Sequence, residues 1–233
     1  MILSGLPEKL PSCCDAALVK IKCAYTAYKE HPNIAQFYYG ISGQDTVYAV
    51  IGKLSGYISL WSNGSQIEEL QNFLKFLGFN GIFTSKKTAL ALNLKINEEC
   101  FVFKIEPPFE AAECRENCLP RDLLNILRQG LEIPDGDQFV ADVTFRVNHG
   151  CADYAVENGS GALLFFNESD ALINGIAVPR NMRGKGHGSR IIKQILSRAG
   201  QRSVYACCIE KNKNFYIKNG FSLIGEAAYC EEQ

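Results

Sequence analysis

The residues best suited to chemistry form a glycine-rich loop, Arg183-Gly184-Lys185-Gly186-His187-Gly188. Glycines at alternate positions can adopt positive φ angles, which let successive backbone N–H groups converge on one small region. The loop leads into a predicted helix that Gly200 ends, with apolar residues at helical spacing: Ile191, Ile192, Ile195, Leu196 and Ala199. Because a helix N-terminus attracts anions and Arg183, Lys185 and Arg190 surround it, the loop predicts a phosphate-binding site.

The loop matches neither of two common phosphate-binding motifs. A dinucleotide-binding loop would have glycine at position 189, which is Ser189, and a Walker loop would contain Gly-Lys-Ser or Gly-Lys-Thr. Taken alone, the loop also fits a glycine-rich turn whose basic side chains are solvated.

Two apolar runs of strand length flank the loop and its helix. The first runs from Leu172 to Val178 and ends at Pro179, and the second runs from Val204 to Ile209. A strand, a helix and a second buried strand predict a right-handed crossover between parallel neighbours. The loop therefore lies at the carboxyl end of the first strand.

These features resemble the GNAT superfamily of acetyl-CoA-dependent N-acetyltransferases. The family's loop reads Arg/Gln-x-x-Gly-x-Gly/Ala after a strand that ends in Ala-Val and a proline, as Ala177-Val178-Pro179 does here. A second motif, Leu/Phe-Tyr-x-x-x-Gly-Phe, is matched by Phe215 to Phe221 at the expected distance. The resemblance is clear from about Phe139 to Tyr229 and fainter from about Cys100.

The resemblance implies a fold and a cofactor site. The fold is an α/β (α+β) domain with a mixed, mostly antiparallel sheet around a parallel strand–helix–strand core. The pyrophosphate of acetyl-CoA, a co-substrate, would rest on the backbone amides of Arg183, Gly184, Lys185, Gly186, His187, Gly188 and Ser189. The pantetheine arm would pair with Ile176, Ala177 and Val178, where the two parallel strands must separate after Val178.

Tyr216 is the predicted catalytic residue, because its position four residues before Gly220 matches the family's general acid. A phenol with a pKa of about 10 is protonated at neutral pH and can donate to the departing thiolate. An aromatic residue that only packs on the sheet is the competing interpretation.

Two departures from the family pattern concern the base and the pantetheine. Leu172 and Asn174 stand where many relatives have an acidic base, and Glu168, Asp170 and His149 are weaker candidates, so the base could be water. Ile209 replaces an asparagine that binds pantetheine in relatives, and Asn212 or Asn214 could substitute for it. The sequence thus predicts acetyl transfer to a primary amine by direct attack in a ternary complex. The alternative is a non-catalytic acetyl-CoA sensor or interaction module.

The first hundred residues predict a smaller α/β domain, with a division into domains 1–106 and 107–233 near Pro107 and Pro108. Helices are expected over Asp15–Tyr28 and Ile67–Leu77, and strands over Gln36–Tyr39, Thr46–Ile51, Tyr57–Trp61, Gly81–Thr84 and Cys100–Lys104. The segment around Asn63-Gly64-Ser65 repeats the strand–loop–helix–strand order, so the half could be a degenerate GNAT-like copy that shapes the acceptor pocket. Because Glu68 and Glu69 occupy the first helical turn, this half is not expected to bind acetyl-CoA.

The remaining C-terminal elements follow from their spacing. Leucines at helical spacing predict a helix over Arg121–Leu131, whereas Phe139–Val147 and Cys151–Val156 are predicted strands. Gly159-Ser160-Gly161 is the predicted turn of a hairpin.

Composition limits the partners. With 24 basic and 25 acidic residues the chain carries no basic footprint for nucleic acid or a membrane surface. The first residues lack a signal-peptide pattern, so a cytoplasmic protein is expected. The ten cysteines and three histidines lack metal-ligand spacing, so no metal is expected and the cysteines are interpreted as reduced thiols. The acceptor is expected to be a small-molecule or peptide amine, and exposed strand edges could support a homodimer.

Overall fold

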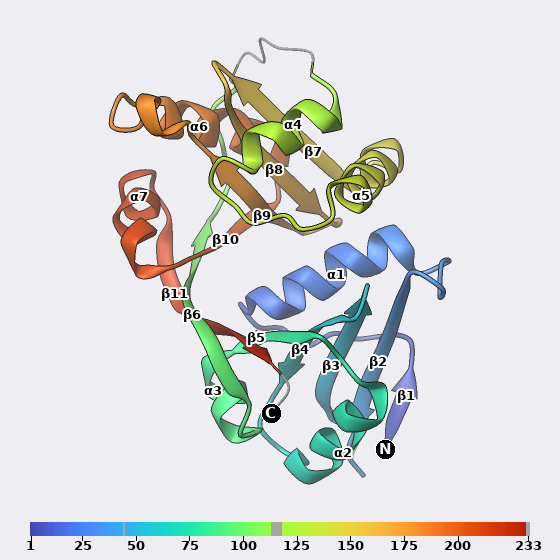
Figure 1. Cartoon of the computed structure of the whole chain (residues 1–233). Coiled ribbons are helices and arrows are strands. Elements are labelled where there is room, and N and C mark those ends of the chain that lie inside the picture. The colour runs from blue at the N-terminus through green and yellow to red at the C-terminus, as the bar shows by residue number, and fades with distance from the viewer. Residues whose placement is uncertain (44, 113–117, 232–233) are drawn as a thin grey trace. The chain divides into compact units, whose positions relative to one another are not determined.

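The computed structural model describes residues 1–43, 45–112 and 118–231. The chain forms two compact units that are not continuous in sequence (Figure 1). The first contains Met1–Phe103, Cys207–Ile217 and Ser222–Gln233, and the second contains Lys104–Ala206 and Lys218–Phe221. The division into domains 1–106 and 107–233 stays a prediction, and residues 113–117 of its linker lie outside the described residues. The compact units differ from that division because segments after Ala206 pack with the first unit.

The second unit is built on a mixed sheet whose strand order is β10-β9-β8-β7. The strands are β7 (Ala152–Glu157), β8 (Ser160–Phe166), β9 (Asp170–Ala177) and β10 (Ser203–Cys208). The pairs β7/β8 and β8/β9 are antiparallel, whereas β9 and β10 are parallel and joined through α6 (His187–Ala199). The predicted crossover and the mostly antiparallel α/β sheet are confirmed. Asn158 and Gly159, with φ of 51° and 69°, form the β7–β8 turn, whereas Ser160 and Gly161 of the predicted turn already belong to β8.

Two helices precede this sheet. The predicted helix over Arg121–Leu131 is confirmed as α4 (Pro120–Leu127), which packs on β8 and β9. The predicted strand over Phe139–Val147 is wrong, because these residues lie in α5 (Gly136–Asn148). The Asp135 carboxylate caps α5 by accepting a hydrogen bond from the Gln138 amide at 2.8 Å.

A buried arginine explains why α5 does not show a helical apolar pattern. Arg146 is 2% exposed, and its Nε donates to the Asp142 carboxylate one turn earlier at 2.8 Å. Its guanidinium carbon lies 4.2 Å from the centre of the Phe165 ring. A position that faces the core therefore carries a charged residue, which removes the periodicity on which a helix prediction depends.

The first unit has the strand order β1-β2-β3-β4-β5-β11-β6. Its strands are β1 (Ile2–Ser4), β2 (Ala35–Ile41), β3 (Val47–Leu54), β4 (Tyr57–Ser62), β5 (Gly81–Ser85), β6 (Lys95–Ile105) and β11 (Ser222–Glu231). Its helices include α1 (Ala16–Tyr28), α2 (Ile67–Leu77) and α3 (Lys86–Ala91). The strands and helices predicted for this region are confirmed, whereas α3, which Ser85 caps by accepting from the Thr88 amide, was not predicted.

Alternating residues of this sheet face two different cores. Ile82 and Ala228 pack with Leu70 and Leu74 of α2, whereas their sequence neighbours Phe83 and Ala227 pack with Ala16 and Ala17 of α1. Since side chains alternate between the two faces of a strand, α1 covers one face of the sheet and α2 the other.

The C-terminal strand completes the sheet of the first unit. β11 pairs with β5 in antiparallel register, with Ala228 opposite Thr84 and Cys230 opposite Ile82. Ala228 is 0% exposed in the core beneath α2. The last strand of the chain is thus part of the core of the N-terminal half.

The order of elements in the N-terminal half recurs in the C-terminal half. The N-terminal order is α1-β2-β3-β4-α2-β5-α3-β6. It begins with a helix of 13 residues and three strands joined as two antiparallel pairs, and continues with a helix, a parallel strand, a helix of 6 residues and a last strand. The same description fits α5-β7-β8-β9-α6-β10-α7-β11, where α7 spans Lys213–Lys218. The last strands are exchanged, because β11 pairs with β5 while β6 is the neighbour of β10 in the strand order.

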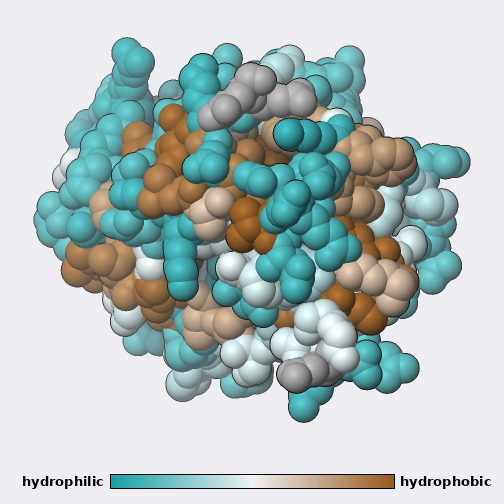
Figure 2. All heavy atoms as spheres, turned by 90° about the horizontal axis from the view of Figure 1, so that it is seen from below, coloured by the Kyte–Doolittle hydropathy of each residue, from teal (hydrophilic) through white to brown (hydrophobic). Residues whose placement is uncertain are grey.

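The surface mixes polar and apolar residues. On the face drawn in Figure 2, hydrophobic residues gather in patches between hydrophilic ones. Large exposed apolar side chains include Phe76, Tyr57 and Leu90. Among the described residues, no helix combines the length and the apolar character that crossing a membrane requires.

Candidate active site

The glycine loop has the backbone geometry that anion binding requires. Gly184 and Gly186 have φ of +75° and +83°, and a Cβ at either position would meet open space. They are therefore glycines because of their backbone conformation and not because of crowding. Gly188 differs from the expectation, since it lies inside α6, which begins at His187. The first amides of α6 have no acceptor within the helix, so they are available to an anion at the open side of the loop.

Basic side chains around the loop are tied to neighbouring elements of the second unit. The Arg183 Nε donates to the Val178 carbonyl at 3.0 Å, which connects the loop to the end of β9. An Arg190 terminal nitrogen lies 2.8 Å from His187 Nδ1, and Arg190 Nε lies 3.9 Å from a Glu157 carboxylate oxygen. Glu157 also accepts a hydrogen bond from Gln194 at 3.0 Å. Sequence reasoning did not identify Glu157, which anchors α6 from the end of β7.

The strand before the loop has an unpaired edge where the pantetheine site is predicted. The parallel ladder ends at Ile173 and Ala206 in the part of the chain that is described, although β9 continues to Ala177. On the other side, Leu163 pairs with Gly175 and Leu164 with Ile173, so Asn174 is an extra residue in a β-bulge. The two strands therefore part after Ile173, not after Val178 as expected. The backbone of Ile176, Ala177 and Val178 follows this bulge, and β10 does not pair with it, although the Val178 carbonyl accepts from Arg183.

These residues fit the phosphates and the amide arm of a coenzyme A thioester. Positive-φ glycines and a helix N-terminus supply uncharged donors, and an unpaired strand edge supplies donors and acceptors in alternation. The exposed Arg183, Lys185 and Arg190 side chains supply positive charge near the loop.

Tyr216 lies in the first unit, on α7. It is 4% exposed, and its ring stacks on Phe103 of β6 with centroids 5.4 Å apart and planes 19° apart. Burial raises the pKa of the Tyr216 phenol above its ordinary value, and the Cys208 and Cys207 thiols add to this effect. The phenol is therefore protonated at neutral pH, as a general acid must be.

The other candidates have mostly structural surroundings. Asn212 ends a 3₁₀ turn (Glu210–Asn212) in the first unit, before α7. Asp170 is 9% exposed at the start of β9 and accepts a hydrogen bond from Ser169 at 2.8 Å. His149 caps the end of α5 and stacks on Phe145 with centroids 4.1 Å apart. Asn174, at the bulge, is exposed.

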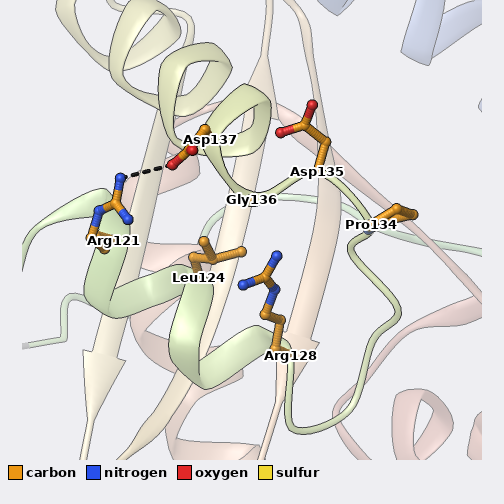
Figure 3. A pocket seen from close by; sticks show the side chains of 7 residues that line it. All are labelled: Arg121, Leu124, Arg128, Pro134, Asp135, Gly136 and Asp137. Carbon is orange, nitrogen blue, oxygen red and sulfur yellow. Dashed lines mark hydrogen bonds and ion pairs between the residues drawn. The ribbon is translucent and has the colours of Figure 1, made fainter.

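A pocket of about 630 Å³ lies between α4 and the start of α5 (Figure 3). Its polar walls hold arginines that already have partners. Arg121 binds the Asp137 carboxylate at 2.9 Å, and Arg128 donates to the Ile133 carbonyl at 3.1 Å. A Cβ added to Gly136 would lie only 2.6 Å from a terminal nitrogen of Arg128, so this position leaves no room for a side chain. The pocket lining contains none of the predicted site residues.

Comparison with known families identifies the C-terminal part. Residues 135–223 match the family described as Acetyltransferase (GNAT) domain. This segment begins at the cap of α5 and includes the loop, the bulged strand and Tyr216. In this part the chain is thus similar to GNAT acetyltransferases. None of the curated proteins matches the sequence.

Solved structures share the fold of this chain. A GCN5-related N-acetyltransferase from Sphaerobacter thermophilus has a TM-score of 0.61 and 12% identity, covering 100% of this chain and 95% of that one. A GCN5-related N-acetyltransferase from Kribbella flavida has a TM-score of 0.58 and 11% identity, covering 91% and 95%. A tandem GNAT protein from the clavulanic acid biosynthesis pathway has a TM-score of 0.52 and 13% identity, covering 84% and 81%. At these identities the similarity establishes the fold.

Proposed function

We propose that this protein transfers an acetyl group from acetyl-CoA to a primary amine, by direct attack of the amine within a ternary complex. The observation that carries the proposal is the parting of β9 from β10 at the Asn174 bulge, directly before the loop of positive-φ glycines. An unpaired strand edge followed by a helix N-terminus suits a ligand that carries amides at one end and a pyrophosphate at the other.

In the proposed complex the pyrophosphate accepts hydrogen bonds from amides between Arg183 and Ser189. The pantetheine arm extends along Ile176, Ala177 and Val178, and Asn212 supplies a further contact. A backbone N–H of this strand faces the thioester oxygen and stabilises the oxyanion of the tetrahedral intermediate, an effect of roughly 3–4 kcal/mol per donor in comparable sites.

Tyr216 acts as the general acid of the proposed reaction. As the tetrahedral intermediate collapses, the phenol donates its proton to the coenzyme A thiolate. The neutral amine attacks first, and its surplus proton passes to water, because the exposed side chain on β9 is the uncharged Asn174.

In this proposal the N-terminal half is a degenerate copy of the same fold that does not bind acetyl-CoA itself. Its loop amides are already occupied: Ser65 N binds the Asn63 side chain at 2.9 Å and Gly64 N binds Ser62 Oγ at 3.1 Å. Glu68 and Glu69 lie in the first turn of α2, and β3 pairs with β4 without a bulge. The half therefore lacks the features that would hold a pyrophosphate. Its β6 instead supplies Phe103, on which Tyr216 packs.

Calorimetry with acetyl-CoA tests the cofactor site. Gly186→Val places a β-branched residue at a φ of +83°, which distorts the loop, so we expect the dissociation constant to rise at least about tenfold. Gly64→Val is the matched control, because Gly64 has a φ of +89°, open space around it and the corresponding place before α2. Its binding should equal that of the unmodified chain.

Equal binding by both variants and the unmodified chain would contradict the loop assignment. If acetyl-CoA binds at the loop but no amine in a broad screen releases coenzyme A, the chain is an acetyl-CoA sensor or interaction module instead.

A further inference from the structure

Two cysteine thiols from neighbouring strands interact in the first unit. Cys100 lies on β6 and Cys207 near the end of β10, and these strands are neighbours in the strand order. Cys100 is 3% exposed within the core that α1 covers, together with Phe83 and Ala227. Cys207 packs against the same core but is partly exposed, and the two thiols share a hydrogen bond. Both are free cysteines.

The shared hydrogen bond gives the two sulfurs different roles. The hydrogen bond from Cys207 holds the pKa of the Cys100 thiol below its ordinary value, and the Lys20 ammonium acts in the same direction. The same hydrogen bond, followed by burial, raises the pKa of the Cys207 thiol well above its ordinary value. Cys100 is therefore the more acidic of the two thiols, and Cys207 is the hydrogen-bond donor.

The Lys20 ammonium, which also lowers the pKa of the Cys100 thiol, packs over two aromatic rings. It lies 5.0 Å from the centre of the Phe83 ring and 5.8 Å from that of Tyr229, so two aromatic faces hold it in the same unit as Cys100. A thiolate beside a cation is the form of cysteine that reacts with oxidants.

The pKa values of Cys208 and Cys230 shift in the opposite direction to that of Cys100. Cys230 is also 3% exposed in the first unit, but burial raises the pKa of its thiol to about 11. Cys208 follows Cys207 directly, and burial raises the pKa of its thiol to about 11 as well. Cys13 and Cys14 are exposed. Cys230 is thus a buried reference thiol, and Cys13 and Cys14 are exposed ones.

We propose that Cys100 and Cys207 are a redox-active pair that a hydroperoxide converts into a reversible disulfide, with Cys100 oxidised first and Cys207 as the resolving thiol. Hydrogen peroxide, the smallest member of this class, is small enough to reach a sulfur that is nearly buried. The proposal is independent of acetyl transfer.

The steps balance in atoms and electrons. The Cys100 thiolate attacks one peroxide oxygen, the O–O bond breaks, and the products are Cys100 sulfenic acid and hydroxide. The Cys207 sulfur then attacks the sulfenic sulfur, the S–S bond forms, and the oxygen leaves as a second hydroxide. The proton of Cys207 and one from solvent convert both hydroxides to water. The two sulfurs together lose two electrons, and a dithiol reductant returns them by thiol–disulfide exchange.

The disulfide would join two strands next to the element that carries Tyr216. Phe103, three residues after Cys100 on β6, stacks on Tyr216, and Lys213 of α7 lies over the Phe101 ring at 4.2 Å. The disulfide would therefore form in a part of the first unit where residues from both halves of the sequence are in contact.

Mass spectrometry of the folded full chain tests the proposal. The chain is treated with hydrogen peroxide, its remaining thiols are alkylated, and the disulfide-linked peptides are identified. We expect a Cys100–Cys207 link that disappears after reduction with dithiothreitol, while Cys230 is still a free thiol. Modification of Cys230 to the same extent as Cys100 would show reaction of unfolded chains and would overturn the proposal, as would the absence of the link.

Two variants separate the roles of the sulfurs. In Cys207→Ser the sulfenic acid cannot be resolved, so dimedone should label Cys100. In Cys100→Ser the Cys207 thiol should resist peroxide at the dose that oxidises the unmodified pair. Cys208→Ser is the matched control and should form the link as the unmodified chain does. Dimedone labelling of Cys207 in place of Cys100 would reverse the assigned roles and contradict the proposal.

Discussion

The phenol of Tyr216 is held by contacts on two sides of its ring. Phe103 stacks on one face with centroids 5.4 Å apart, and Phe215 meets the ring edge to face at 5.3 Å. Such contacts fix the direction of the hydroxyl at little entropic cost, because the ring has few rotatable bonds. A fixed, protonated phenol is suited to a single proton transfer, which is the role proposed for it.

Tyr216→Phe removes the proton and keeps the ring. We expect the turnover number for coenzyme A release to fall about 10²-fold, the size of general acid–base effects, with acetyl-CoA affinity unchanged. Steady-state kinetics and calorimetry measure the two quantities. Tyr48→Phe is the matched control, since Tyr48 is a fully buried tyrosine of the same unit. Unchanged turnover in Tyr216→Phe would remove the assignment.

The same burial predicts how stability depends on pH. The pKa of Tyr216 is raised in the folded chain, mainly by burial, so folding favours the neutral phenol. This contribution to stability is fully present below the unfolded pKa of about 10 and is lost as the pH rises above it. Between pH 8 and pH 11 the urea midpoint of unfolding should therefore fall further for the unmodified chain than for Tyr216→Phe, which lacks the phenol. Equal losses would show that folding does not raise the pKa of the Tyr216 phenol.

Single residues differ in how well their sequence reveals their role. Gly184 and Gly186 were predicted because alternating glycines directly before an amphipathic helix form a local pattern that indicates an anion-binding turn. Glu157 was not predicted, because a lone glutamate at the end of a strand looks like any solvated charge until Arg190 and Gln194 are found beside it. Partners distant in sequence leave no local pattern.

At the scale of elements, the bulge in β9 gives the proposed site its shape. Asn174 interrupts the β8–β9 ladder directly after the last residue that pairs with β10. A bulge increases local twist and bends its strand, which explains why β9 leaves its parallel neighbour there. The Asn174-Gly175 pair within an apolar run was the available signal, because glycine inside a strand often marks a bulge.

Deletion of Asn174 should restore a regular β8–β9 ladder. The parallel pairing with β10 could then extend toward Val178, and the strand edge proposed for pantetheine would be lost. We expect acetyl-CoA binding to weaken at least about tenfold in calorimetry, while the chain still unfolds cooperatively. Asn174→Ala keeps the bulge and should bind as the unmodified chain does. A deletion variant that binds normally would contradict the role of the bulge.

Helix α5 shows where sequence patterns fail for a whole element. Phenylalanine, valine and threonine between Phe139 and Val147 favour a strand by composition, and the buried Arg146 hides the helical face. The correct signal was Asp135, an N-cap residue whose carboxylate accepts from the Gln138 amide three residues later. Asp135 was instead interpreted as part of a turn. Helix α6 was predicted correctly because its buried face is made of isoleucine and leucine.

At the scale of the whole molecule, the repeated order of elements and the exchanged last strands suggest two copies of one fold. The repetition of strand, loop, helix and strand was visible in the sequence around Gly64 and Gly186. The exchange was not, because strand pairing between residues far apart is not encoded in local spacing. Ala227 and Ala228 are small residues that any sheet could accept, yet they face two different cores of the first unit.

The exchange makes the last strand a structural part of the N-terminal half, and Ala228 tests this directly. Ala228 is 0% exposed among Leu60, Leu70 and Ile82, so Ala228→Asp would bury a carboxylate without a partner and should cost at least about 3 kcal/mol of unfolding free energy. Leu223→Asp, at a position of the same strand that is 46% exposed, should cost no more than about 0.5 kcal/mol. Urea unfolding gives both values. Hydrogen exchange then locates the loss: protection in Ala228→Asp should fall in β3, β4 and β5, more than a hundred residues before the substitution. If protection falls only within β11, the strand is an appendage and the N-terminal half folds without it.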